Sequence, residues 1–387
     1  MMTVHKNYRW GITSVYSAAH FLIDFACAFL MFRSIVAAPS RSLCVLLYNF
    51  CAFAMQMPIG VIADVLRRNA LLAVTGCALV ASAYGLAVFP VVAAVTAGIG
   101  NSLFHLGGGI EVLSISEERM SALGVFVSPG AFGIYFGTLL GKGNALGIAP
   151  VVAALLAAAV AICFYPGVRV SARSQSSGAG ETVSRNYTLP PGSARYAVAA
   201  AALLLPVVCV RSFAGLAISF PWKVGLLPGV LLTCAVVFGK AGGGFLADRF
   251  SPAKTSILSL GLCVPLFFFP AIPAAGIVSM FLFNMTMPIT LWAVAKAFPG
   301  AKGFSFGLLT FGLFLGYLPV HFGAGVPDGA SWFFPLAALV SLALLLGGLK
   351  VAGKCGANPA TDDGEALTQI PILRARRGAG PEFPKER

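Results

Sequence analysis

The feature that most constrains this chain is a run of twelve apolar stretches, which follow one another along most of its 387 residues. A helix needs about 20 apolar residues to cross the hydrocarbon core of a bilayer, and each stretch is close to that length. Only 10% of the residues are charged, whereas soluble domains have roughly a quarter. A soluble enzyme, a disordered chain and a disulfide-rich secreted scaffold are therefore excluded. The stretches are predicted at residues 10–32, 43–65, 70–89, 91–113, 121–140, 145–166, 197–219, 225–246, 254–271, 273–295, 303–324 and 330–349.

The loops between these stretches define the organisation of the chain. The longest internal loop, 168–194, is rich in Ser, Gly and Arg and is predicted to be a flexible linker. It leaves six helices on each side, so we expect an all-α membrane protein with twelve transmembrane helices in two six-helix bundles. The bundles are expected at 1–167 and 195–349, followed by a polar tail at 350–387 that is expected to be disordered.

The basic residues are distributed unevenly between the two sides of the predicted membrane. The net charge is +13, from 26 basic and 13 acidic residues. With the N-terminus in the cytoplasm, 20 of the 26 basic residues fall on the cytoplasmic side, and only Arg33, Arg41, Lys142 and Lys223 fall in the outer loops. The positive-inside rule then predicts a multi-pass protein of the cell (inner) membrane with both termini cytoplasmic. The basic charge therefore indicates orientation and contact with the lipid bilayer, and no nucleic-acid partner is expected.

The two halves share an internal repeat. Several residues recur at an almost constant offset of about 184 positions, each time on the corresponding helix. This pattern indicates two six-helix halves in parallel repeat, the arrangement of major facilitator transporters. The recurring pairs are Asp64 with Asp248, Asn101 with Asn284, Arg119 with Lys302, Gly124 with Gly307, and Gly133 with Gly316.

The sequence Gly-x-x-Ala-Asp ends the second and the eighth predicted helix. It resembles the loop motif of the major facilitator family, which implies a latch that holds the two bundles in one state. Glycine lets two helices approach closely, and basic residues lie within reach of each Asp. The alternative is a plain loop ion pair that anchors the topology. The predicted latch residues are Gly60, Asp64, Arg67, Arg68, Gly244, Asp248 and Arg249.

Ionisable side chains inside the predicted membrane helices are few, and each costs roughly 2.5–3.5 kcal/mol on insertion scales. His20 and Asp24 are one turn apart and share a helix face near mid-bilayer. Arg211 lies at a similar depth in the seventh helix. We hypothesise an Asp24–Arg211 ion pair, or a cavity in which both face water. Asp24 and His20 would then exchange protons while Arg211 attracts an anionic substrate; a buried structural pair is the alternative.

Other polar residues extend this candidate site. His105 lies one turn from Asn101 and beside Gly107–Gly109, which are expected to loosen the helix. Lys240 is expected to snorkel to the membrane surface, and Glu111 to be solvated at a helix end. Hydrogen bonds between helices are the alternative role of these polar groups. The predicted substrate-binding residues are Arg211, His105, Asn101, Asn49, Gln56 and Asn284.

The fifth predicted helix carries Pro129 with glycines at positions 130, 133 and 137. Such a helix is proposed to seal a leak in exporters, and close packing is the equal alternative. No ATP-binding loop is present, and a Gly-x-Ser-x-Gly sequence at 303–307 opens a membrane helix instead of a strand–helix turn. We therefore expect no enzymatic activity, no cofactor and no metal site.

The first 145 residues carry a more specific resemblance. His20-Phe-Leu-Ile-Asp24 is similar to the His-x-x-x-Asp of the fosmidomycin-resistance group of bacterial efflux transporters. Gly100-Asn-Ser-Leu-Phe-His105 is similar to its fourth-helix motif, and Gly141-Lys-Gly-Asn144 to the loop after its fifth helix. The chain departs from the group at Leu106 and Gly107, where the group has Pro and an acidic residue. The resemblance implies a proton-driven exporter of small molecules, including anions.

These observations predict a secondary active transporter for the proton-coupled efflux of a small molecule, anions included, by alternating access. A proton-linked importer of a sugar or organic acid is an alternative. A second alternative is a non-transporting membrane scaffold with a protein partner at its C-terminal tail. The mid-membrane charges favour transport, because a scaffold has no need to keep them.

Overall fold

The computed structural model describes residues 2–116, 119–165, 168, 193–326, 330 and 332–355. The predicted linker and C-terminal tail lie almost wholly outside these residues. The described part is helical and contains no strand. Its main helices are α1 (Met2–Leu30), α2 (Arg41–Asn49), α3 (Gln56–Leu66), α4 (Asn69–Ala83), α5 (Pro90–Ile115), α6 (Met120–Val127), α7 (Pro129–Gly143), α8 (Ile148–Phe164), α10 (Ala194–Ala217), α11 (Leu226–Phe250), α12 (Pro252–Leu266), α13 (Pro273–Asn284), α14 (Met287–Ala297), α15 (Lys302–His321) and α16 (Phe333–Lys354).

These helices form the twelve predicted spans. Ten spans are long and apolar enough to cross a membrane, and two shorter apolar helices, α8 and α12, complete the set. Three spans consist of two helical pieces each: α2 with α3, α6 with α7, and α13 with α14. A π-helical turn, η2 (Phe50–Ala54), joins α2 to α3, and another, η1 (Met31–Ile35), extends α1. The prediction of an all-α membrane protein with twelve helices is confirmed.

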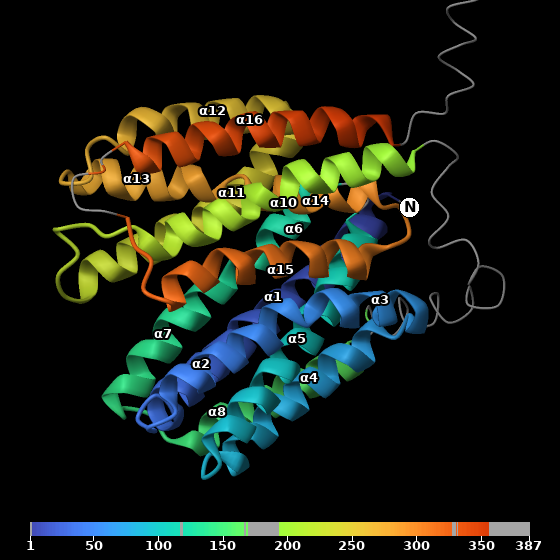
Figure 1. Cartoon of the computed structure of the whole chain (residues 1–387). Helices are drawn as coiled ribbons and strands as arrows, with labels where there is room; N and C mark the ends of the chain where they lie inside the picture. Colours follow the sequence, from blue (N-terminus) through green and yellow to red (C-terminus); the bar gives the residue numbers. More distant parts are fainter. Residues whose placement is uncertain are drawn as a thin grey trace, which may run out of the picture.

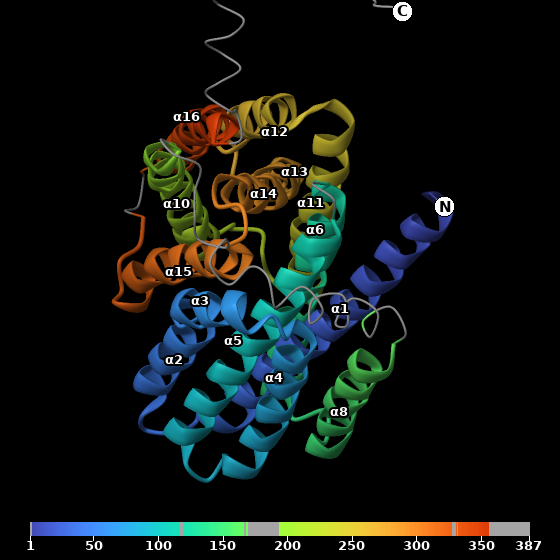
Figure 2. The same ribbon diagram turned by 90° about the vertical axis from the view of Figure 1, so that its right-hand side faces the viewer.

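The helices lie in two groups (Figure 1). One group holds α1 to α8, drawn in blue to green, and the other holds α10 to α16, drawn in yellow-green to red. Seen along the other direction, α15 lies beside α3, and α6 beside α11, so each group has a helix against the other (Figure 2). The two-bundle arrangement expected from the sequence repeat is therefore present.

Glycines set the spacing between α1 and α7. A Cβ atom at Gly133 or Gly137 would collide with the backbone carbonyl of Phe21 or Phe25. Since only glycine allows helix backbones to approach this closely, the packing interpretation of the fifth predicted helix explains its glycines.

The fourth predicted helix is not loosened by its three glycines. Helix α5 runs unbroken from Pro90 to Ile115, and Gly107 packs against the backbone of α4. The expectation of a discontinuity there is wrong, because the backbone of α4 and aromatic side chains occupy the space that the missing side chains leave. The chain breaks instead at Ser128, between α6 and α7.

Candidate functional site

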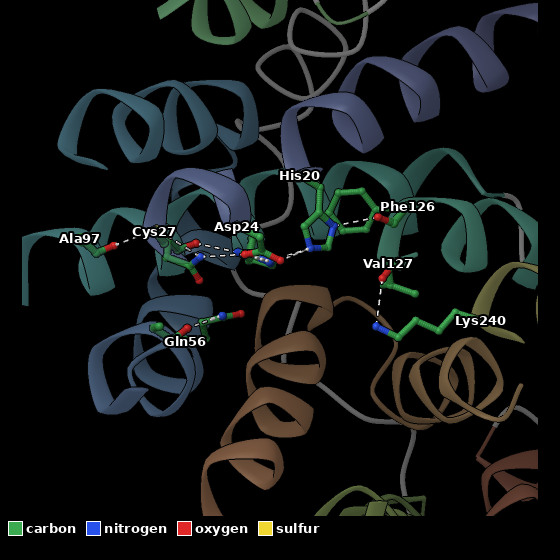
Figure 3. Close-up of polar contacts among 11 residues, drawn as sticks. His20, Asp24, Cys27, Gln56, Ala97, Phe126, Val127 and Lys240 are labelled. Atoms are coloured by element: carbon green, nitrogen blue, oxygen red, sulfur yellow. Dashed lines mark hydrogen bonds and ion pairs between the residues drawn. The ribbon is translucent and has the colours of Figure 1, made fainter. Parts of the chain in front are cut away.

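Four buried side chains from α1 and α5 form a polar cluster around Asp24 (Figure 3). Oδ2 of Asp24 lies 3.2 Å from Nε2 of His20, and Oδ1 of Asp24 lies 3.6 Å from Nε2 of His105. Asn101 donates a hydrogen bond from Nδ2 to Oδ1 of Asp24, at 3.0 Å. The four side chains are at most 8% exposed. The structure therefore brings together the predicted proton-exchanging pair with two of the predicted substrate-binding residues.

The two histidines are oriented by backbone carbonyls. Nδ1 of His20 lies 2.7 Å from the oxygen of Phe126, and Nδ1 of His105 lies 2.9 Å from the oxygen of Asn101. A carbonyl only accepts hydrogen bonds, so each Nδ1 is assigned a proton. In a neutral imidazole the Nε2 atom is then an acceptor, and these two acceptors face each other at 2.9 Å. This contact is a hydrogen bond only when the pair holds one additional proton.

The break at Ser128 supplies the carbonyl that orients His20. Pro129 has no N–H to continue the ladder of α6, and the N–H of Ala131 donates to Ser128 instead of to Val127. The carbonyls of Phe126 and Val127 are therefore open to side chains from other helices. Gly130, which follows Pro129, has no Cβ. A Cβ at this position would collide with the carboxylate of Asp24 and the ring of His20.

Lys240 of α11 reaches the same break from the other bundle. Its Nζ points toward the carbonyl of Val127, at 3.4 Å (Figure 3). The ammonium is also close enough to Asp24 and to Arg211 for electrostatic interaction with both. The expectation that Lys240 snorkels to the membrane surface is wrong, because the opened helix offers it an acceptor inside the protein.

Arg211 does not form the hypothesised ion pair. The ion pairs that the structure shows for Asp24 are with His20 and His105. Arg211 is 8% exposed, and its Nη1 is buried with no hydrogen-bond partner among the described residues. The second histidine takes the place at Asp24 that the sequence argument gave to Arg211. The buried guanidinium of Arg211 can therefore still donate a hydrogen bond from Nη1.

The three remaining polar candidates each donate to the backbone carbonyl four residues earlier in the chain. Asn49 donates to the carbonyl of Val45, Gln56 to that of Ala52, and Asn284 to that of Met280. Such bonds satisfy an amide locally. They leave the amide oxygen of Gln56 buried and without a partner among the residues described. The structure does not bring these three residues to the Asp24 cluster.

The two Gly-x-x-Ala-Asp sequences join the bundles reciprocally. Asp64 at the end of α3 accepts hydrogen bonds from the backbone N–H groups of Gly303 and Phe304, at 2.7 and 2.9 Å. Asp248 of α11 accepts from those of Met120 and Ser121, at 2.7 and 3.0 Å. Each carboxylate thus caps the N-terminus of a helix in the other half, where the first N–H groups have no partner within their helix.

Glycines make both contacts close. A Cβ at Gly60 would collide with the carbonyl of Gly303, and one at Gly244 with that of Met120. Arg249 takes no part in the second contact: it is exposed and lies over the ring of Phe250, 5.8 Å from the ring centre. The carboxylate of Asp248 is instead occupied by the N–H groups at the start of α6, so the alternative of a plain ion pair with Arg249 does not describe this contact.

Glu111 is buried near the same end of the molecule. It is 1% exposed and accepts a hydrogen bond from Nδ2 of Asn69, at 3.1 Å. The expectation that it is solvated is wrong, because α5 continues past it to Ile115 and α4 packs alongside.

Comparison with solved structures identifies the fold. The E. coli fucose:proton symporter FucP superposes with a TM-score of 0.56 at 14% identity, covering 89% of this chain and 98% of that chain. FucP in the outward conformation gives 0.55 at 13% identity, covering 89% and 99%. A bacterial homologue of the iron transporter ferroportin, in an outward-facing state with soaked iron, gives 0.55 at 14% identity, with the same coverage. No protein-family model and no curated protein matches the sequence. The chain has the major facilitator fold, and the matched structures are of transporters, not enzymes.

Proposed function

We propose that this chain, a membrane protein with the major facilitator fold, is a secondary active transporter that exchanges protons for a small anionic molecule. The observation that carries the proposal is the buried His20–Asp24–His105 cluster, whose facing Nε2 atoms need one added proton to bond. A mid-membrane carboxylate is costly to keep. Its partners and its position at the contact between bundles support a proton-coupling role.

The cluster is suited to gain and lose one proton. With the proton present, one imidazolium is hydrogen-bonded to the neutral second ring and lies beside a carboxylate. Without it, two lone pairs face each other and Asp24 keeps Asn101 as its hydrogen-bond donor. The two protonation states therefore favour different packing of α1 against α5 and the α6–α7 break. That difference is what couples a proton to a movement of bundles.

The other bundle provides the attraction for an anion. Among the described residues, Arg211 has a buried donor without a partner, and Lys240 makes one long hydrogen bond. Because these two cations interact unfavourably with each other, an anion between the bundles would relieve the repulsion. The resemblance of the first 145 residues to the fosmidomycin-resistance group supports export as the direction.

The reciprocal caps indicate which conformation is present. Both bind the bundles together at the end of the molecule that holds Asp64 and Asp248, which we call the motif end. We propose that the motif end is cytoplasmic, as the charge distribution predicts, so the structure is an outward-facing state. Two of the matched structures are of outward or outward-facing states.

The test is substrate-induced proton movement in inside-out vesicles that contain the chain. A panel of small anions, phosphonates included, is screened for collapse of an imposed pH gradient. The wild type should respond to at least one compound, and Asp24→Asn, which removes the charge at nearly constant volume, should not. His321→Ala is the matched control, because His321 contacts Tyr317 at the far end of α15.

The direction of the response separates the alternatives. Proton flux opposite to that of the compound supports exchange, and flux in the same direction supports a proton-linked importer. No response to any compound in the panel, with the chain shown to be inserted, contradicts the transport proposal and favours the scaffold.

A further inference from the structure

We propose that His20, Asp24 and His105 form a binding site for one divalent transition-metal ion of the zinc and iron class. Their ligand-type atoms lie within 4.8 Å of one another. The chain has four histidines in all, and two of them meet here although they are 85 residues apart in the sequence. This inference goes beyond the proposed transport function and does not depend on it.

The ring orientations are those of metal-binding histidines. A histidine that binds a metal through one nitrogen usually donates its other N–H to a carbonyl or carboxylate, which fixes the tautomer and the ring. Both rings here have that arrangement, with Nδ1 on the carbonyls of Phe126 and Asn101. Both Nε2 atoms are therefore left without a proton in the neutral rings, and both lie beside the carboxylate of Asp24.

The spacing of the three groups suits a single ion. The Nε2 atoms are 2.9 Å apart, Oδ2 of Asp24 lies 3.2 Å from that of His20, and Oδ1 of Asp24 lies 3.6 Å from that of His105. Two ligands that are each about 2.1 Å from a tetrahedral ion are about 3.4 Å apart. An ion therefore fits with shifts of a few tenths of an ångström.

The second shell of this site is also in place. Asn101 donates its amide N–H to Oδ1 of Asp24, which fixes the carboxylate beside the two imidazole rings. Such outer hydrogen bonds orient a carboxylate ligand and raise metal affinity. Three protein ligands leave a further coordination position open, as in sites where the ion exchanges or binds a second molecule.

The donor set selects the class of ion. Imidazole suits zinc, iron, nickel and copper, whereas calcium and magnesium prefer oxygen ligands throughout. Two imidazoles and one carboxylate form the set found in non-haem iron sites and in some zinc sites. Because the ion would occupy the same Nε2 atoms as the shared proton, a protein loaded with metal cannot take that proton.

The experiment is a titration of the full-length chain in detergent, purified without a polyhistidine tag and stripped with a chelator. Co²⁺ binding is followed by visible absorption and Zn²⁺ binding by calorimetry. We expect one ion per chain and a Co²⁺ spectrum without the near-ultraviolet band of thiolate ligands. Stoichiometric binding with that spectrum supports the site.

Variants assign the ligands. His20→Ala and His105→Ala should each weaken binding at least about 100-fold, and Asn101→Ala about 10-fold, as expected for a residue that positions a ligand. His321→Ala should bind as the wild type does. Thermal unfolding of each variant shows whether it is folded.

Three results would overturn the proposal: no stoichiometric binding to the wild type, a thiolate band, or equal affinity in the wild type and folded His20→Ala. None of these measurements requires transport. Failure of the metal site and failure of proton-coupled transport are therefore distinguishable.

Discussion

Removal of the Asp64 carboxylate should open the motif end of the molecule. In the structure this buried carboxylate accepts two backbone hydrogen bonds at the start of α15, in the other bundle. Loss of a helix N-cap costs about 0.5–2 kcal/mol, and hydrogen bonds to a charged group contribute about 1.5–3 kcal/mol. Because the contact exists only while the bundles are closed at this end, we expect Asp64→Ala to shift the conformational equilibrium by about 2 kcal/mol, or about 30-fold.

The repeat supplies a second, weaker version of the same experiment. Asp248 makes the equivalent contact with α6 but is exposed, so water competes for its hydrogen bonds. We expect Asp248→Ala to shift the equilibrium by about half as much, about 1 kcal/mol or 5-fold. The two caps lie at separate interfaces, so the double variant should show roughly the sum of the two effects.

The assay is a distance distribution measured by double electron–electron resonance. Labels on Val65 and Phe250, which are exposed residues on opposite bundles at the motif end, report closure in a background with the native cysteines replaced. Arg249→Gln is the matched control, because Arg249 follows Asp248 but makes no contact with the other bundle among those the structure describes. If Asp64→Ala leaves the distribution unchanged, or if Arg249→Gln shifts it as much as Asp248→Ala does, the capping argument is refuted.

Two other predictions concern the cluster and the anion site. Gly130→Ala should abolish proton-driven transport and lower the melting temperature, since the new Cβ would displace Asp24 and His20. Gly143→Ala, whose Cβ would meet only ordinary contact, should change neither transport nor melting temperature. Equal transport activity of the two variants would contradict the placement of the cluster. Arg211→Gln should raise the apparent KM for an anionic substrate at least 10-fold, with a smaller change in kcat. This is the effect expected for loss of a charge-assisted hydrogen bond of about 1.5–3 kcal/mol. An unchanged KM for the anion would exclude Arg211 from the substrate site.

The fold was predictable from the sequence because its signals are local and repeated. The length of an apolar stretch decides whether it can cross the bilayer, and the constant offset between the halves indicates the two bundles. The His20–Asp24 pair was also predictable, since residues one turn apart on a helix share a face. These predictions use only the spacing along one element or between two copies of it.

Which residues make up the site was harder to predict from the sequence, because this depends on contacts between elements that are distant in the chain. Nothing near Asp24 indicates that His105 completes its shell instead of Arg211. The position of Lys240 depends on a carbonyl that opens only because Pro129 interrupts the helix and Ala131 bonds elsewhere. Three consecutive glycines looked like a break, yet they are packed against the backbone of α4 and against aromatic side chains, and the single proline produced the discontinuity.

The capping contacts were missed for a similar reason. An Asp beside arginines suggests an ion pair, and the competing partners, the free N–H groups at the start of α6 and α15, carry no side-chain signal. The internal repeat does mark the two capped helix starts. Arg119 and Lys302 correspond, and the residues that follow them are the ones that Asp248 and Asp64 cap.

Our central proposal is that the His20–Asp24–His105 cluster holds the coupling proton while the substrate binds elsewhere, and substrate counterflow in proteoliposomes tests it most directly. Counterflow without a pH gradient requires only binding and alternating access, whereas accumulation driven by a pH gradient also requires the proton. We predict that Asp24→Asn retains counterflow and loses gradient-driven accumulation, with the wild type and His321→Ala showing both. Gradient-driven accumulation that persists in Asp24→Asn would contradict the proposal.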